Sequence, residues 1–250
     1  MSKQAADQSL FQAAKEQMLG KMQGERGIGT LSEKSVHSVL KFYYAPDEKY
    51  HEIQVGTHFA DTCVDGEIHE IQTRQFYKLN DKLEEFLNTF KMDVTIVYPV
   101  SVENTIFWID PESGEIKKSK TTKTPKNIYK VFRELYGIRD YLDHPNLHLT
   151  IAELATEDYR LLDGYGKEKK KRATKTDKVP VAFPEEIHFD RIKDAVALLP
   201  DTLPDEFTAA DFGHETGLKS VDCSAGLLLF YRLGVLEREK AGRAYLYKRI

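Results

Sequence analysis

The pattern of apolar and polar residues predicts two helices between residues 30 and 90. The first is opened by Thr30-Leu31-Ser32-Glu33 and ended by Pro46. Its apolar positions share one helical face and are Val36, Val39, Leu40 and Tyr43. The second helix covers Phe76 to Phe90, and its apolar positions are Leu79, Leu83, Phe86 and Leu87.

Short strands are predicted between and after these helices. Three segments, His51 to Val55, Phe59 to Val64 and Glu67 to Thr73, are separated by turn residues and indicate consecutive antiparallel strands. The β-branched run from Val94 to Val100 is typical of a buried strand. The predicted order is therefore α, β, β, β, α, β, in an α/β fold with a mixed sheet.

The remaining segments divide the chain into three parts. Residues 1–29 are expected to form a detachable N-terminal helix, over residues 4–22, and a linker. Residues 30–200 form the α/β domain, which a hairpin near Pro111 to Gly114, a helix from Ile128 to Leu142 and a strand from His148 to Leu154 extend. Residues 204–250 predict a small winged-helix-like domain, with helices and a hairpin at Ala209 to Thr216, Val221 to Leu233, Val235 to Glu239 and Ala244 to Lys248.

Composition is that of a folded protein, with 41% hydrophobic and 30% charged residues. The sequence has no apolar run long enough to span a membrane and no secretory pattern in Met1 to Ser9, so a cytoplasmic location without membrane attachment is expected. Cys63 and Cys223 are too few for a disulfide framework and are interpreted as core thiols.

The net charge of -4 argues against a protein that coats nucleic acid indiscriminately. Basic residues are nevertheless concentrated in two segments. Lys117 to Lys126 holds five Lys and no acid, and Lys167 to Lys178 holds seven bases against two acids. Either segment could be a solvated linker, or it could bind phosphates if a neighbouring site requires them.

Asp65-Gly66 predicts a two-residue hairpin turn that sets the register of its strands. Partner numbers then sum to 131, so Thr62 faces His69 and Asp61 faces Glu70. Alternation places Asp61, Glu70 and Gln72 on one side of the hairpin. Two facing carboxylates repel each other, and a hard cation such as Mg²⁺ would resolve the conflict. The alternative is structural, with Asp61 paired to Arg74 and Glu70 exposed on a half-wet sheet.

Asp61, followed after eight residues by Glu70-Ile71-Gln72-Thr73-Arg74, resembles the PD-(D/E)XK nuclease superfamily, particularly its Holliday-junction-resolvase-like members. The resemblance implies a restriction-endonuclease-like αβββαβ core that binds Mg²⁺ or Mn²⁺ through Asp61, Glu70 and Glu33. Gln72 departs from the family's Lys, and Gln can hold a water but carries no positive charge.

Two residues of the first helix have alternative interpretations. Glu33 also completes a capping box with Thr30, which would use its carboxylate to close the start of the helix. His37, one turn later, is more often a surface or core histidine than a ligand.

Basic residues of the two predicted domains are the candidate DNA contacts. In the α/β domain they are Arg74, Lys169, Lys170, Lys171 and Arg172. The predicted recognition helix of the C-terminal domain is mostly apolar, so its contacts would come from Lys219, Arg238, Lys240 and Arg243. A protein-interaction or homodimerising role fits that domain equally well.

The leading hypothesis is a metal-dependent DNA endonuclease or DNA-junction-processing enzyme. The alternative is a non-catalytic DNA-binding or regulatory protein that keeps the nuclease fold. An RNA-directed nuclease and a protein-interaction module are the remaining classes.

Overall fold

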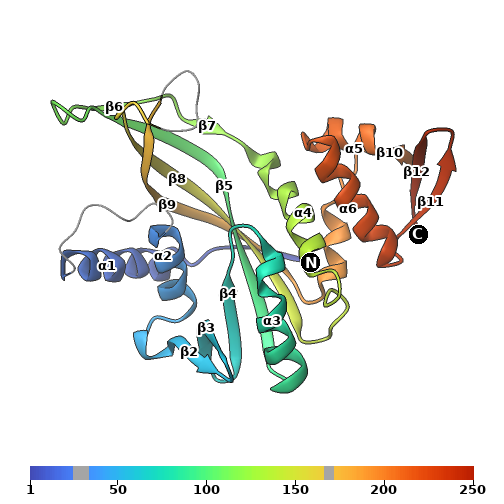
Figure 1. Ribbon diagram of the computed structural model, residues 1–250, viewed down its shortest axis with the longest axis horizontal. Helices are drawn as coiled ribbons and strands as arrows, with labels where there is room; N and C mark the ends of the chain where they lie inside the picture. Colours follow the sequence, from blue (N-terminus) through green and yellow to red (C-terminus); the bar gives the residue numbers. More distant parts are fainter. Residues whose placement is uncertain (25–33, 166–171) are drawn as a thin grey trace.

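The computed structural model describes residues 1–24, 34–165 and 172–250, and a large mixed sheet dominates it (Figure 1). In the described part of the chain this sheet has nine strands in the order β1-β9-β8-β5-β4-β3-β2, and β6 and β7 pair with β5. The strands are β1 Ser2–Ala5, β2 His51–Val55, β3 His58–Val64, β4 Glu67–Ile71, β5 Asp93–Ile109, β6 Ile116–Lys118, β7 Thr122–Lys123, β8 Leu147–Leu161 and β9 Thr174–Phe189.

Parallel pairing at the centre of the sheet requires cover on both faces. Strand β5 runs parallel to β4 on one side and to β8 on the other, whereas β3 and β9 flank this centre in antiparallel pairs. Central parallel strands bury both faces, which explains the continuous apolar run from Val94 to Val100.

Helices cover the two faces of the sheet (Figure 1). Helices α1 Gln8–Gly24 and α2 Lys34–Tyr44 share a core with Ile71, Val97 and Leu154. On the opposite face, α3 Asn80–Leu83 and α4 Val131–Leu135 pack against Ile68 and Ile96. Among the described residues, no helix is long and apolar enough to cross a lipid bilayer.

The predicted order of the first six elements is confirmed as α2, β2, β3, β4, α3 and β5. The helix expected over Phe76 to Phe90 is one helical segment of mixed geometry. It starts with a 3₁₀ turn at Phe76–Leu79, continues through α3 and ends in a π-helical turn at Glu84–Thr89. The α/β class is therefore correct.

The N-terminal segment is not a detachable helix. Residues Ser2–Ala5 form β1, which pairs antiparallel with Glu185–His188 of β9. Helix α1 then buries Phe11, Ala14 and Met18 in the core beneath α2. Pairing with a distant strand leaves no local pattern in the sequence. The sequence therefore does not predict that Ser2–Ala5 joins the sheet.

Strands β5 and β8 are much longer than predicted, at 17 and 15 residues. They stay paired from Val94–Leu147 to Ile109–Leu161 and form an arm that extends past the helices (Figure 1). Strand β9 completes the arm, so Lys175 and Lys178 belong to a strand rather than to a basic loop over Lys167 to Lys178. Residues 167–171 of that segment lie outside the described residues.

The C-terminal region has the predicted helices and hairpin. Its elements are β10 Glu206–Thr208, α5 Ala209–Thr216, α6 Ser220–Arg232, β11 Leu236–Ala241 and β12 Ala244–Arg249, and its strands are arranged β10-β12-β11. This region shares its core with the large sheet, because Phe132 of α4 packs against Phe212 and Phe230.

Close packing between α4 and α6 depends on Gly226. A methyl group added there would lie 2.9 Å from Cβ of Phe132, whereas one added at Gly20 of α1 meets nothing within 4 Å. We predict that Gly226→Ala lowers the free energy of unfolding by about 1–3 kcal/mol through overpacking. The matched change Gly20→Ala should raise it by about 0.5–1 kcal/mol, since alanine favours a helix. Denaturant unfolding measures both, and stabilisation by Gly226→Ala would contradict the described contact.

Candidate functional site

The hairpin of β3 and β4 has the register that its turn predicts. Thr62 pairs with His69, Cys63 with Ile68 and Val64 with Glu67. Both turn residues have positive φ, 51° at Asp65 and 91° at Gly66, as a type I′ turn requires. The next residues along the two strands are Asp61 and Glu70.

The carboxylates of Asp61 and Glu70 each accept a hydrogen bond from the backbone of the strand that carries the other. The backbone N–H of Ile71 donates to Oδ2 of Asp61 at 2.8 Å, and the N–H of Asp61 donates to Oε1 of Glu70 at 3.2 Å. The side chains are 14% and 3% exposed. The hairpin therefore ends in two adjacent carboxyl groups that are both largely removed from water.

Each carboxyl group also has a basic partner from a different helical layer. Nε2 of His37, on α2, lies 2.9 Å from Oδ2 of Asp61. Nζ of Lys82, on α3, donates to both oxygens of Glu70, at 2.8 and 3.1 Å. These contacts show that the protein itself relieves part of the repulsion expected between the carboxylates of Asp61 and Glu70.

The two carboxyl groups have opposite pKa shifts. Burial and the charge of Asp61 raise the pKa of Glu70 to about 7, although Lys82 opposes this shift. Burial would also raise the pKa of Asp61, but the hydrogen bond and charge of His37, the N–H of Ile71 and the charge of Lys82 together lower it. Near neutral pH the pair therefore holds one firmly ionised carboxylate and one that is partly protonated.

The pair lies where a parallel strand ends at the centre of the sheet. Ile71 is the last residue of β4 and is aligned with Val97 of β5, which is aligned with Thr150 of β8. Ligands of open α/β sheets commonly bind outside the carboxyl ends of the strands. Thr73 and Arg74, just beyond this end, line a pocket of about 370 Å³ together with residues of β5, β8 and β9.

The other predicted residues of this site have other hydrogen-bond partners or lie outside the described residues. Gln72 was expected beside Asp61 and Glu70, but its Nε2 donates to the backbone oxygen of Arg74 at 2.5 Å. Glu33 lies outside the described residues. Among the residues that the structure does describe, no group of three or more His, Cys, Asp or Glu side chains is placed to hold a metal ion.

The candidate DNA contacts are dispersed over the structure. Arg74 lines the pocket, and Arg172 is exposed before β9. Lys169, Lys170 and Lys171 are outside the described residues. In the C-terminal region Lys219, Lys240 and Arg243 are exposed.

Arg238 has an intramolecular role instead. Its guanidinium lies 4.1 Å from the ring centre of Tyr231 and 4.4 Å from that of Tyr245. Cation–π contact with two rings holds this side chain against its own domain. Arg238 is therefore less suited to reach DNA than the sequence suggested.

Sequence analysis missed Lys82 as a site residue and gave His37 little weight. Lys82 adjoins the core residue Leu83, and no local pattern marks it as different from other lysines. The contact with Glu70 depends on how α3 packs on the sheet. The only available signal was the buried acid itself, which demands a cationic partner from some element.

Together these features define an α/β protein with a buried carboxyl pair and a basic pocket at the end of a central strand. The model for the family described as Domain of unknown function (DUF8091) matches residues 34–190, and the chain belongs to this family. The match includes the pair and the pocket and ends before the C-terminal region. An uncharacterized protein of Treponema pallidum (strain Nichols) is 28% identical over 224 residues, which cover 89% of this chain and 87% of the relative. No solved structure matches.

Protonation of Glu70 makes stability depend on pH. Because its pKa is about 7 when folded against an ordinary 4.5, the folded protein holds an extra proton between these values, and this stabilisation is lost as pH rises through 7. The free energy of unfolding of the unaltered protein should therefore fall by on the order of 3 kcal/mol between pH 4.5 and 7. We predict that Glu70→Gln removes this fall. Urea unfolding at a series of pH values measures the slope. Glu67→Gln, on the same strand, controls for loss of a carboxylate, and a slope that Glu70→Gln leaves unchanged would refute the prediction.

Proposed function

We propose that the protein is a metal-dependent phosphodiesterase that acts on DNA, an endonuclease or junction-processing enzyme with a PD-(D/E)XK-type core. One observation carries this proposal, namely the adjacent and largely buried carboxyl groups of Asp61 on β3 and Glu70 near the end of β4. Their spacing and the order α, β, β, β, α, β are those of the superfamily that the sequence resembles.

The oxygen donors of the pair suit a hard divalent cation such as Mg²⁺ or Mn²⁺. Asp61 and Glu70 would hold the cation, and Glu33 is the further carboxylate that the resemblance implies. When bound, such a cation polarises a phosphodiester and lowers the pKa of an attacking water. The raised pKa of Glu70 is consistent with this role, because the pair lacks enough positive charge to ionise fully at neutral pH.

Lys82 supplies the positive charge that Gln72 does not. Its Nζ is bonded to Glu70, so an ammonium group stands beside the carboxyl pair although none occupies the expected place in β4. We assign Lys82 the work of stabilising negative charge that develops on phosphate oxygens. His37 orients Asp61 through the bond between Nε2 and Oδ2.

The C-terminal helices and hairpin are proposed to form a winged-helix-like domain that contacts the same DNA. Lys219 at the start of α6 and Lys240 and Arg243 on the hairpin are its exposed basic residues. Such contacts would add affinity without base recognition.

A non-catalytic DNA-binding or regulatory role is the second candidate. The observation that favours it is the intramolecular pairing of both carboxyl groups, Asp61 with His37 and Glu70 with Lys82. A fold that has lost turnover could keep this closed arrangement for stability alone.

Cleavage of DNA distinguishes these candidates. Linear, branched and single-stranded DNA are incubated with the protein and Mg²⁺ or Mn²⁺. We predict that the unaltered protein cleaves at least one substrate, that Asp61→Asn and Glu70→Gln abolish cleavage, and that Lys82→Met slows it about 10²–10³-fold. Glu67→Gln should leave the rate unchanged. Absence of cleavage with both metals and all three substrates would favour the non-catalytic role.

Metal binding is tested separately from turnover. Mn²⁺ should raise the thermal midpoint of the unaltered protein because it binds the folded state. This rise should grow from pH 6 to pH 8, as Glu70 loses the proton that competes with the metal. Glu70→Gln should abolish the dependence, and an equal rise in this variant would place the metal elsewhere.

A further inference from the structure

The pocket beside the carboxyl pair has the composition of an anion site. It has a volume of about 370 Å³ and is lined by Val36, Thr73, Arg74, Pro99, Ser101, Leu154, Thr156, Lys175 and Lys178. Among the described residues that line it, three are cationic, three carry hydroxyl groups and none carries a carboxylate. The volume lies at the lower end of the range for small-molecule sites, about 300–1,000 Å³.

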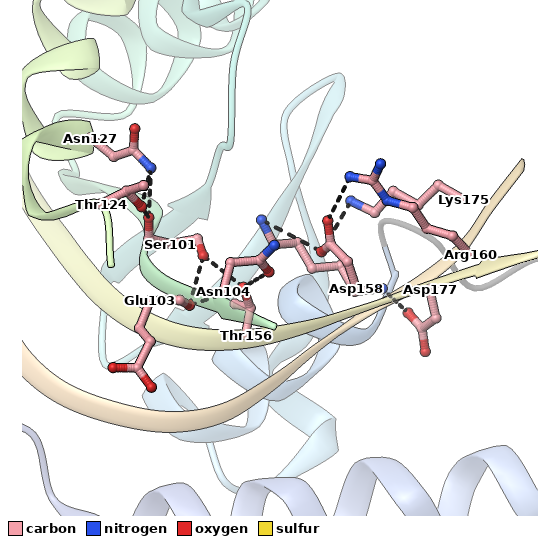
Figure 2. Close-up of polar contacts among 11 residues, drawn as sticks. Ser101, Glu103, Asn104, Thr124, Asn127, Thr156, Asp158, Arg160, Lys175 and Asp177 are labelled. Atoms are coloured by element: carbon pink, nitrogen blue, oxygen red, sulfur yellow. Dashed lines mark hydrogen bonds and ion pairs between the residues drawn. The ribbon is translucent and has the colours of Figure 1, made fainter. Parts of the chain in front are cut away.

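Positive charge is in excess around this pocket. Asp158 is 5% exposed and lies 3.5 Å from Arg160 and 3.8 Å from Lys175 (Figure 2). Lys178 lies 4.0 Å from the same carboxylate. Asp177, which accepts from Ser35 and interacts with Lys175, is the second carboxylate here, so three bases face two acids. Burial lowers the pKa of Lys178, and neighbouring Lys175 lowers it further against the opposing charge of Asp158. A bound anion would relieve this excess.

Hydrogen bonds hold the pocket's hydroxyl groups in place. Thr156 Oγ1 donates to Oδ1 of Asn104 at 2.8 Å and lies 2.6 Å from Oγ of Ser101. The backbone oxygen of Ser101 accepts bonds from Thr124 and Asn127 (Figure 2). Ser101 Oγ also donates to the backbone oxygen of Glu103 at 3.1 Å, so the hydrogens of both hydroxyl groups are used within the protein. These bonds fix the wall that β5 and β8 form, and the cationic side chains remain as the donors for an anion.

The start of α2 contributes to the same site. Ser35, the second residue of this helix, donates from Oγ to both carboxylate oxygens of Asp177 at 3.0 Å, and Val36 lines the pocket. This bond ties the helix to β9 beside Lys178. The next residue, His37, bonds to Asp61, so the pocket and the carboxyl pair share one helical turn.

We propose that this pocket binds a phosphoryl group of nucleic acid, held by the cationic side chains of Arg74, Lys175 and Lys178. Its anion chemistry stands on the geometry alone, whereas the assignment to nucleic acid rests on the proposed function. The phosphoryl group could be a terminal monoester or an internal diester. A monoester carries the additional charge that this excess of bases would favour.

Inorganic phosphate tests the pocket in the absence of metal. With chelator present, phosphate should raise the thermal midpoint of the protein above that in chloride of equal ionic strength. Lys178→Gln and Lys175→Gln should each raise the dissociation constant for phosphate at least tenfold. Lys117→Gln, on the exposed strand β6, should not change it. Lys175 is 40% exposed and its loss leaves Arg160 and Lys178 beside Asp158, so this variant should fold even if Lys178→Gln does not.

Oligonucleotides that carry or lack a 5′ or 3′ phosphate identify the source of the phosphoryl group. Fluorescence anisotropy in chelator measures their binding to Asp61→Asn, which is expected not to cleave. Tighter binding of a phosphorylated end, lost in a variant that also carries Lys175→Gln, assigns a terminal monoester. Equal binding of all ends that is weakened by Lys175→Gln assigns an internal diester. Phosphate and oligonucleotide binding unaffected by both lysine changes would overturn the proposal. Phosphate binding without DNA cleavage would overturn only the proposed activity.

Discussion

Parallel pairing of β4, β5 and β8 is the constraint on which the rest of the structure depends. Such strands need a helical layer on each face, and β4 ends at Ile71, level with Val97 and Thr150, at an edge past which β5 and β8 continue. The layer of α2 brings His37 to Asp61, and the layer of α3 brings Lys82 to Glu70. Without cover on both faces, the carboxyl pair would lose the two basic side chains that make its burial tolerable.

Burial in turn gives the pair its chemical character. An exposed Glu70 would be ionised at neutral pH, whereas the buried side chain next to Asp61 has a pKa of about 7. The long pairing of β5 with β8 then carries the polar arm past this edge, so that Lys175 and Lys178 of β9 line a pocket near the pair. The proposed metal ligands and the proposed anion site thus both depend on how the strands are arranged around the end of β4.

Local features were predictable from the sequence, and long-range contacts were not. Asp65-Gly66 specified the register of its hairpin because a two-residue turn leaves one choice of pairing. The partners of the carboxyl groups depend on helix docking, which no short pattern encodes. Strand β9 was missed because lysines and two prolines, Pro180 and Pro184, argue against a strand. In the described structure β1 pairs with β9 only over Glu185–His188, so both prolines fall outside the ladder with β1.

Paramagnetic broadening by Mn²⁺ tests most directly whether the carboxyl pair is a metal site. The backbone amides of Asp61 and Ile71 donate to the two carboxyl groups, so their resonances report a cation bound there. At substoichiometric Mn²⁺ we predict that these two signals broaden first, that the amide of Phe207 in β10 is unaffected, and that Glu70→Gln abolishes the effect. Broadening centred on another part of the chain, or unchanged in Glu70→Gln, would contradict this account.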